Sequence, residues 1–222
     1  MCGRYTLRTK LNQLLELYAL DAVVDWRPRY NIAPTQQVVA VRNGESEREM
    51  ALLRWGLVPS WADDLKIGAR MINARGETVA TKPSFRSAFK RRRCLIIADG
   101  FYEWKKFSDH KVPFYIRMED ERPFAFAGLW ERWNKSDSPV ESCTIITTTP
   151  NDLMSDLHDR MPVILSGDDA DLWLDPEVDD AEALQQLLIP YPNDGLTAFP
   201  VSTLVNSPKN DSEECLTPNE IT

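Results

Sequence analysis

The stretch CLIIADGFYEWKK (residues 94–106) predicts an apolar strand that turns at Gly100 and then continues. Other strand signals surround it: VVAVR (38–42), PFYIRM (113–118), PFAFAGLW (123–130) and SCTIITTT (142–149), and LRWGLVPSWADD (53–64) is expected to be a strand that leads into a loop. These strands follow one another without regular βαβ alternation, which excludes a doubly wound parallel sheet. The sequence therefore predicts an α+β fold with a mostly antiparallel, barrel-like β-sheet and flanking helices.

Helices are expected on both sides of this strand-rich region. Leu11, Leu14, Leu15 and Tyr18 recur at helical spacing, so residues 9–20 are expected to form an amphipathic helix. The other expected helices are SFRSAFKRRR (84–93), NDLMSDLH (151–158), DADLWL (169–174) and AEALQQLL (181–188). The passage DWRPRYNIAPTQQ (25–37) contains two prolines and is expected to be a loop.

Length and composition indicate one globular domain. A chain of 222 residues can bury one sizeable core, so we expect a single domain over 1–222, with the polar segment 207–222 lying on the surface. No apolar run approaches the roughly 20 residues that span a bilayer, and charged residues interrupt the first 20 positions. We therefore expect a cytoplasmic protein, nucleoid-associated if the source is bacterial, with no membrane partner.

The cysteines and the charge restrict the classes of site and partner. Four cysteines lie far apart, without a C-x-x-C pair, and there are only two histidines, so neither a metal site nor a disulfide framework is expected. No cofactor is expected. A net charge of −8 argues against attraction of nucleic acid by bulk charge, although a local basic groove stays possible. Without coiled-coil heptads, we expect a monomer.

The amino terminus, MCGRY, places a cysteine where it becomes the first residue once Met1 is removed. Cys2 then carries an α-amine and a thiol on adjacent carbons, a 1,2-aminothiol. Ordinary pKa values of about 7.7–8.0 for the amine and about 8.5 for the thiol leave part of each nucleophile unprotonated near neutral pH.

Five segments place polar residues where folding does not require them: CGRY, RYNIAP, MINARGET, DGFYEWKK and LHDRMPVIL. Each has a structural alternative when taken alone. Asn73 could cap a turn, Glu103 could be a solvated strand residue, and His158 could be an interfacial histidine with its hydrogen bonds satisfied. Together, and in this order, they indicate a functional site.

In these motifs the sequence resembles the SRAP family, the SOS-response-associated peptidases now regarded as abasic-site processing proteins. The resemblance extends from MCGRY through RWGLVPSW and RRRCLIIADGFYEW to FPVSTLVN, nearly the whole chain. It implies a protein that recognises abasic sites in single-stranded DNA and links itself to them through its amino-terminal cysteine. Carried over by position, Cys2 is the nucleophile, Asn73 and Glu103 assist it, and His158 completes the site. Arg4, Arg75 and Arg160 then lie near phosphates or the lesion.

The remaining expected DNA contacts form a wider surface. Further residues expected at this surface are Asn31, Pro34, Trp61 and Arg86. Arg29, Arg70 and the run KRRR (90–93) could extend it into a cationic track, or they could be surface cations paired with the abundant carboxylates. Trp61 could stack on a base or wedge beside the lesion, and it is followed by Ala62 where relatives often carry a second large apolar side chain.

The residue types suit this chemistry independently of the family. The open-chain aldehyde of an abasic deoxyribose is attacked by a neutral amine to give a Schiff base, and the adjacent thiol then closes a five-membered thiazolidine ring. A carboxylate such as Glu103 can transfer protons, Asn73 can orient the sugar, and His158 can protonate the ring oxygen or assist reversal.

Two other functions stay open at the level of sequence. Cys2 could be the nucleophile of an amino-terminal cysteine peptidase or amidohydrolase whose own α-amine is the base, including one that acts only to remove Met1. The protein could also be a non-catalytic single-strand binding module whose affinity survives loss of Cys2.

Overall fold

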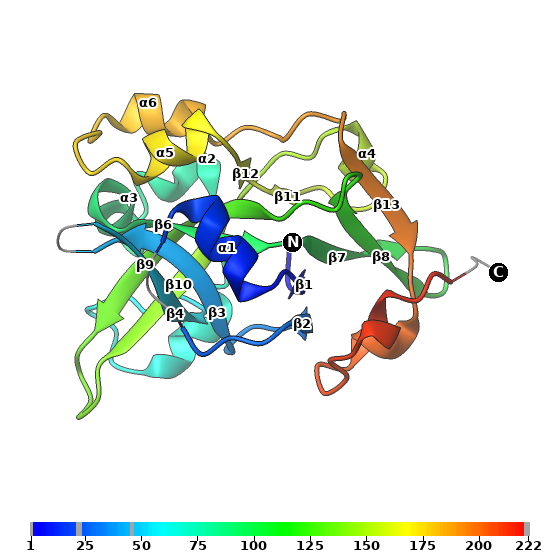
Figure 1. The fold of residues 1–222 in the computed structure, drawn as a ribbon. Coiled ribbons are helices and arrows are strands. Elements are labelled where there is room, and N and C mark those ends of the chain that lie inside the picture. Colours follow the sequence, from blue (N-terminus) through cyan, green and yellow to red (C-terminus); the bar gives the residue numbers. More distant parts are fainter. Residues whose placement is uncertain (1, 21–23, 45–46, 220–222) are drawn as a thin grey trace.

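A computed structural model describes residues 2–20, 24–44 and 47–219. Its strands form two sheets, one closed into a barrel and one open, with helices around them (Figure 1). Among the described residues, no helix has the length and apolar character needed to cross a membrane.

Five strands close the barrel. In order around the ring they are β10 (Val140–Thr148), β4 (Arg48–Trp55), β3 (Gln37–Asn43), β6 (Arg93–Ala98) and β9 (Phe124–Trp133). The ring closes because β9 also pairs with β10, and only the contact between β10 and β4 is parallel. The expected α+β class with a mostly antiparallel, barrel-like sheet is thus confirmed. The short strands β5 (Asn73–Arg75), β11 (Met161–Pro162) and β12 (Ile164–Leu165) add to its edges.

The second sheet is open and carries the amino-terminal strand. Its order is β13 (Leu196–Pro200), β8 (Lys111–Met118), β7 (Gly100–Lys106), β1 (Tyr5–Leu7) and β2 (Arg29–Ile32), and every pair is antiparallel. The stretch 94–106 therefore supplies one strand to each sheet, with β6 in the barrel and β7 in the second sheet. Gly100 is required at this junction because a Cβ atom there would lie 2.1 Å from the Tyr115 hydroxyl oxygen.

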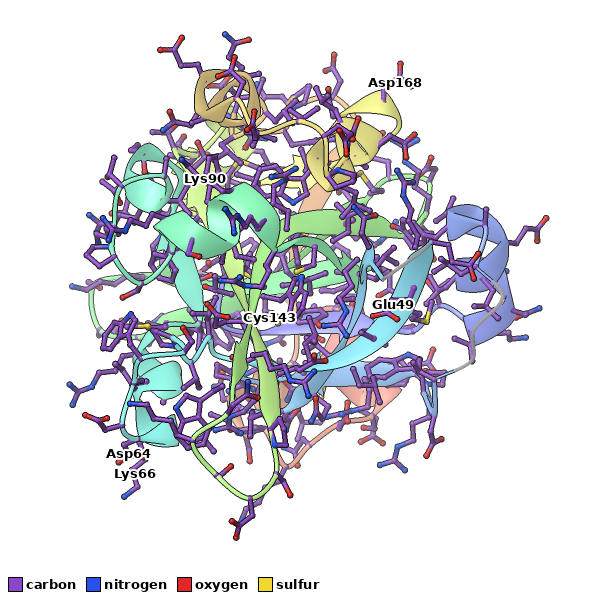
Figure 2. All side chains as sticks on the ribbon, turned by 90° about the vertical axis from the view of Figure 1, so that its left-hand side faces the viewer. Glu49, Asp64, Lys66, Lys90, Cys143 and Asp168 are labelled. Carbon is purple, nitrogen blue, oxygen red and sulfur yellow. The ribbon has the colours of Figure 1, made fainter. Side chains whose placement is uncertain are left out.

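The expected helices are present, all with shorter bounds except α5, which begins one residue earlier than expected. They are α1 (Leu11–Tyr18), α3 (Arg86–Arg91), α4 (Asp152–Ser155), α5 (Asp168–Leu174) and α6 (Ala181–Gln186). The structure adds a short helix α2 (Gly76–Val79) and three 3₁₀ turns, η1 (Leu65–Arg70), η2 (Thr203–Asn206) and η3 (Glu213–Leu216). In the view of Figure 2, the labelled Cys143 lies centrally on the barrel, whereas charged side chains such as Asp64 and Asp168 project at the periphery.

The expectation of a loop over 25–37 was wrong for residues 29–32, which form β2. This strand pairs with β1, and the backbone N–H groups of Tyr30 and Asn31 both donate to the carboxylate of Asp211, at 2.7 and 2.9 Å. Asp211, near the carboxy-terminal end of the chain, thus holds the strand, and no local sequence pattern predicts this contact.

The carboxy-terminal segment folds back against the second sheet (Figure 1, red). Within it, Cys215 is fully buried beside Tyr102, Tyr115, Val201 and Val205. Residues 207–219 therefore contribute to a small apolar core, although most of their polar side chains face outward. Residues 220–222 of the expected tail lie outside the described part of the chain.

Candidate active site

The second sheet fixes the position of Cys2. Tyr5 and Thr6 of β1 pair with Phe101 and Gly100 of β7, and the backbone N–H of Tyr102 donates to the carbonyl of Arg4 at 3.0 Å. This pairing carries the start of the chain along β7 toward the interior. Cys2 is consequently fully buried, with 0% of its surface exposed.

Asn73 reaches Cys2 from the barrel. It begins β5, which pairs in parallel with β10 so that Asn73 lies opposite Ile145. The Asn73 side-chain amide donates to the backbone carbonyl of Cys2 at 2.8 Å. Its Oδ1 is buried and has no hydrogen-bond partner among the described residues, so this oxygen can accept a hydrogen bond from a ligand.

Glu103 lies on β7, opposite Phe114 of β8, with only 3% of its surface exposed. Burial raises the pKa of its carboxyl, while the positive charges of the chain's amino terminus and of His158 act to lower that pKa. Burial also raises the pKa of the Cys2 thiol, and the charge of Glu103 raises it further. Cys2 and Glu103 are therefore both desolvated, and the charge of Glu103 affects the protonation of the Cys2 thiol.

His158 approaches from the segment that follows α4. Its backbone N–H donates to the carbonyl of Met154 at 2.8 Å, which anchors it to that helix. Its Nδ1 lies 2.7 Å from the Asp159 carboxylate and 3.1 Å from the backbone N–H of Arg160. Neutral Nδ1 can accept from Arg160, whereas a protonated ring donates from Nδ1 to Asp159. The positive charge of a protonated His158 lowers the pKa of Glu103, and this effect relates His158 to the group formed by Cys2, Asn73 and Glu103.

The half-buried Arg4 and the buried Asn31 form a hydrogen-bonded pair beside this site. The Arg4 guanidinium donates to Asn31 Oδ1 and to the carbonyl of Val205, both at 2.8 Å, and lies over the Trp104 ring. Asn31 is fully buried, and its amide nitrogen donates to three backbone carbonyls of residues 205–210. The side chain of Asn31 is thus used within the protein. The expected contact of Asn31 with DNA stays a prediction; in the structure Asn31 accepts a hydrogen bond from Arg4.

Arg160 also has a protein partner. Its guanidinium forms a bidentate ion pair with the carboxylate of Glu77 and donates to the carbonyl of Thr147 at 2.6 Å. The hydrogen bonds from Arg160 lower the pKa of Glu77. A DNA phosphate at this position would have to compete with Glu77. Arg29 is likewise paired, with Asp211.

The remaining expected DNA contacts are on the surface. Trp61 is 55% exposed, in the loop before η1, while the adjacent Ala62 is buried. Arg75 and Arg86 are exposed, and no hydrogen bond or ion pair within the described ranges holds either guanidinium. Pro34 is half-buried in the turn after β2.

The run KRRR divides between surface and interior. Arg93 is buried, and its five N–H groups donate to five backbone carbonyls at 2.5–3.1 Å, joining α3 to the end of α5. Arg92 pairs with Glu131 at 2.7 Å. Only Lys90 and Arg91 are exposed. Arg92 and Arg93 are therefore occupied by partners within the protein, and only Lys90 and Arg91 of this run can belong to a cationic track.

Sequence reasoning missed three carboxylates that hold the site together: Asp99, Asp211 and Glu77. Asp99 and Glu77 lie within the motifs DGFYEWKK and MINARGET, which could have pointed to them, whereas no sequence pattern marks Asp211. The described residues contain no cluster of three or more histidine, cysteine or acidic side chains suited to a metal ion. The four cysteines are free and buried.

Comparison with known proteins identifies the family. The family model described as SOS response associated peptidase (SRAP) matches residues 1–208. The abasic site processing protein YoqW of Bacillus subtilis (strain 168) is 48% identical over 221 residues, covering 97% of this chain and 99% of that protein. YoaM, an abasic site processing protein of the same organism, is 47% identical over 97% of each chain. A crystal structure of a protein from Bacteroides thetaiotaomicron superposes with a TM-score of 0.89 at 26% identity, over 99% of this chain and 100% of that one. The chain therefore belongs to the SRAP family.

Proposed function

We propose that this protein recognises abasic sites in single-stranded DNA and bonds covalently to them through Cys2 once Met1 has been removed. One observation carries the proposal: polar side chains from three separate segments converge on the amino-terminal segment that carries Cys2. Asn73 donates to Cys2, the charge of Glu103 acts on the Cys2 thiol, and the charge of His158 acts on Glu103. The names of the relatives YoqW and YoaM, abasic site processing proteins, support the same substrate.

The raised thiol pKa favours an order of events in which the amine reacts first. The neutral α-amine of Cys2 adds to the C1′ aldehyde of the opened sugar, and loss of one water from the carbinolamine leaves a C=N bond. The thiol sulfur then adds to the imine carbon, and its proton passes to the nitrogen. A thiazolidine and one water are the products, so the reaction needs neither an oxidant nor a reductant.

Glu103 is suited to the proton transfers in this sequence. Because burial raises its pKa, a larger fraction of its carboxyl is protonated near neutrality than in an ordinary glutamate. The protonated form can donate to the hydroxyl group that leaves as water, and the carboxylate can accept a proton from the α-ammonium group. Asn73 Oδ1 can accept from a sugar hydroxyl, and His158 can protonate the ring oxygen when the sugar opens.

The accessible groups indicate how the strand is bound. Arg75 and Arg86 are free to neutralise phosphates, and the exposed ring of Trp61 can stack on a base. These contacts are insensitive to base identity, as suits a lesion that has lost its base. An abasic nucleotide has also lost its stacking, so displacing it costs little.

The test compares three proteins on one abasic and one intact single-stranded oligonucleotide, followed by a denaturing gel. The protein with Cys2 at its terminus should give a heat-stable adduct with the abasic strand only. A protein that retains Met1 should give none, because its Cys2 nitrogen is an amide and cannot form an imine. Cys2→Ala with Met1 removed should be trapped only by borohydride. A heat-stable adduct from the blocked protein would refute the aminothiol mechanism.

The same gel separates the alternatives. A peptidase limited to removal of Met1 would process its own terminus and leave the abasic strand unmodified. A simple binding module would retain affinity in Cys2→Ala and never form a covalent band.

A further inference from the structure

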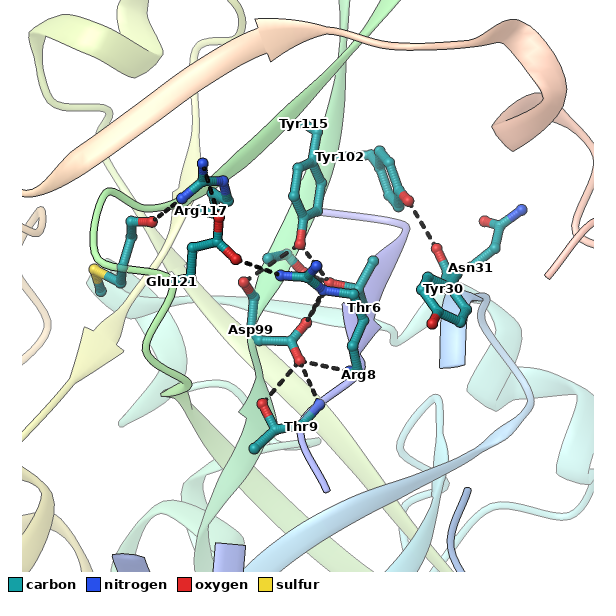
Figure 3. A network of polar contacts seen from close by, with 12 residues as sticks. Thr6, Arg8, Thr9, Tyr30, Asn31, Asp99, Tyr102, Tyr115, Arg117 and Glu121 are labelled. Carbon is teal, nitrogen blue, oxygen red and sulfur yellow. Dashed lines mark hydrogen bonds and ion pairs between the residues drawn. The ribbon is translucent and has the colours of Figure 1, made fainter. Parts of the chain in front are cut away.

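Asp99 occupies the single residue between β6 and β7, where the chain passes from the barrel to the second sheet. It is 1% exposed. A buried carboxylate is costly unless donors surround it, so its partners show what it holds. Figure 3 shows that these partners come from the segment that follows Cys2.

Donors from three residues of that segment converge on the carboxylate. The Thr6 hydroxyl donates to Oδ1 at 2.6 Å, and the Thr9 backbone N–H and hydroxyl donate to Oδ2 at 2.8 and 3.0 Å. The backbone N–H of Arg8 also donates to Oδ2, and Arg8 Nε lies 3.5 Å from Oδ1. Hydrogen bonds to an ionised acceptor are about twice as strong as neutral ones. Asp99 is therefore the main polar anchor of residues 6–9.

A second contact fixes the same segment from the other side. The Thr6 hydroxyl also lies 2.9 Å from the Tyr115 hydroxyl, whose ring occupies the space that a side chain at Gly100 would need. Thr6 is thus held between the carboxylate of Asp99, at the junction of β6 and β7, and the phenol of Tyr115 on β8.

The anchor matters because β1 is short. This strand has three residues and pairs with β7 through Tyr5 and Thr6 only. Cys2 lies three positions before β1, so a displacement of β1 would move the α-amine and the thiol of Cys2 relative to Glu103 and Asn73. A displacement of about 1 Å in a reacting group can lower a rate by about a hundredfold.

We propose that Asp99 is a positioning residue for the covalent reaction: it fixes the amino-terminal strand so that Cys2 meets the lesion in a reactive geometry. This inference rests on the proposed function and adds to it a residue that touches neither DNA nor the reacting atoms. Asp99 acts on Cys2 through the backbone of residues 3–9.

The experiment uses the full chain with Met1 removed and compares Asp99→Asn, Thr9→Val and Glu131→Gln. Asp99→Asn keeps the shape but removes the charge, and Thr9→Val removes one donor while leaving the backbone N–H. Glu131 is the matched control: it is also a buried carboxylate paired with an arginine, Arg92, but it lies on β9 of the barrel. Three quantities are measured: the adduct rate at saturating abasic strand, the affinity for an intact strand, and hydrogen exchange of amides 5–9.

Asp99→Asn should lower the adduct rate about ten- to a hundredfold, leave affinity for intact DNA unchanged, and accelerate exchange at amides 5–9 but not in the barrel. Thr9→Val should show a smaller loss of the same kind, and the two substitutions together should be non-additive because they act on one contact. Glu131→Gln should lower stability without changing the rate. The proposal is overturned if Asp99→Asn reacts at the normal rate, or if Glu131→Gln slows the reaction equally. If the unaltered protein forms no adduct, the proposed function fails, and exchange at amides 5–9 alone decides whether Asp99 anchors the strand.

Discussion

Replacing Asn31 by alanine tests whether this residue positions Arg4. In the structure Asn31 is fully buried, accepts from the Arg4 guanidinium, and donates to carbonyls in the carboxy-terminal segment. Alanine removes all of these contacts while leaving the β2 backbone and its bonds to Asp211 in place. The substitution should therefore destabilise the fold and release Arg4.

The expected loss of stability follows from the number of hydrogen bonds that the Asn31 side chain makes. Two amide protons serve three carbonyls, of Val205, Ser207 and Asn210, so they count as two bonds of about 1 kcal/mol each. The charged bond from Arg4 is discounted to about 1 kcal/mol because Arg4 is only half-buried and can rehydrate. Asn31→Ala should thus lower the free energy of unfolding by about 3 kcal/mol, or the Tm by about 6–12 °C for a chain of this length.

Urea unfolding, followed by tryptophan fluorescence, measures this loss as a shift in midpoint at constant slope. The informative comparison is Asn31→Asp, which keeps an acceptor for Arg4 but loses the donors to the carbonyls. It should be destabilised yet bind abasic DNA better than Asn31→Ala. If Asn31→Ala costs less than about 1 kcal/mol while abolishing DNA binding, the residue contacts DNA and the positioning role is wrong.

Three further predictions concern the charged groups of the site. Glu103→Gln should slow adduct formation about ten- to a hundredfold, measured by quenched time points on a denaturing gel. Burial raises the pKa of Glu103 in the folded protein above its value in the unfolded chain. Ionisation of Glu103 therefore lowers the free energy of unfolding as the pH rises from the unfolded-state pKa to the folded-state pKa. The glutamine variant, which does not ionise, should have the higher Tm at neutral pH. Glu77→Gln should release Arg160, tighten binding of single-stranded DNA and steepen the slope of log K against log salt by about 0.7, and an unchanged slope in fluorescence anisotropy would exclude competition between Glu77 and phosphate. Arg75→Ala should flatten the same slope by about 0.7 and leave the adduct heat-stable, whereas loss of the adduct at saturating DNA would assign Arg75 to the chemistry.

The sequence by itself determined the features that depend on local pattern. Apolar strands around 94–106 and amphipathic helices such as 9–20 have periods that can be read within a few residues, and they predicted the fold class correctly. The position of Cys2 behind Met1 likewise predicted the aminothiol chemistry without reference to a fold. The motifs that resemble the SRAP family also contain Asn73, whose amide donates to Cys2, and Glu103, whose charge acts on the Cys2 thiol; the roles of these residues stay predictions.

Only the tertiary structure decided which charged and polar groups are available. Arg93 and Asn31 looked like candidates for DNA, yet both are buried among backbone carbonyls, and Arg160 already has a carboxylate partner. Strands of three residues, such as β1, are too short to show a period. Asp211 binds the backbone of Tyr30 across 181 positions of sequence. The physical reason is common to these cases: hydrogen bonding and ion pairing depend on distances in space, and partners brought together by folding leave no local pattern in the chain.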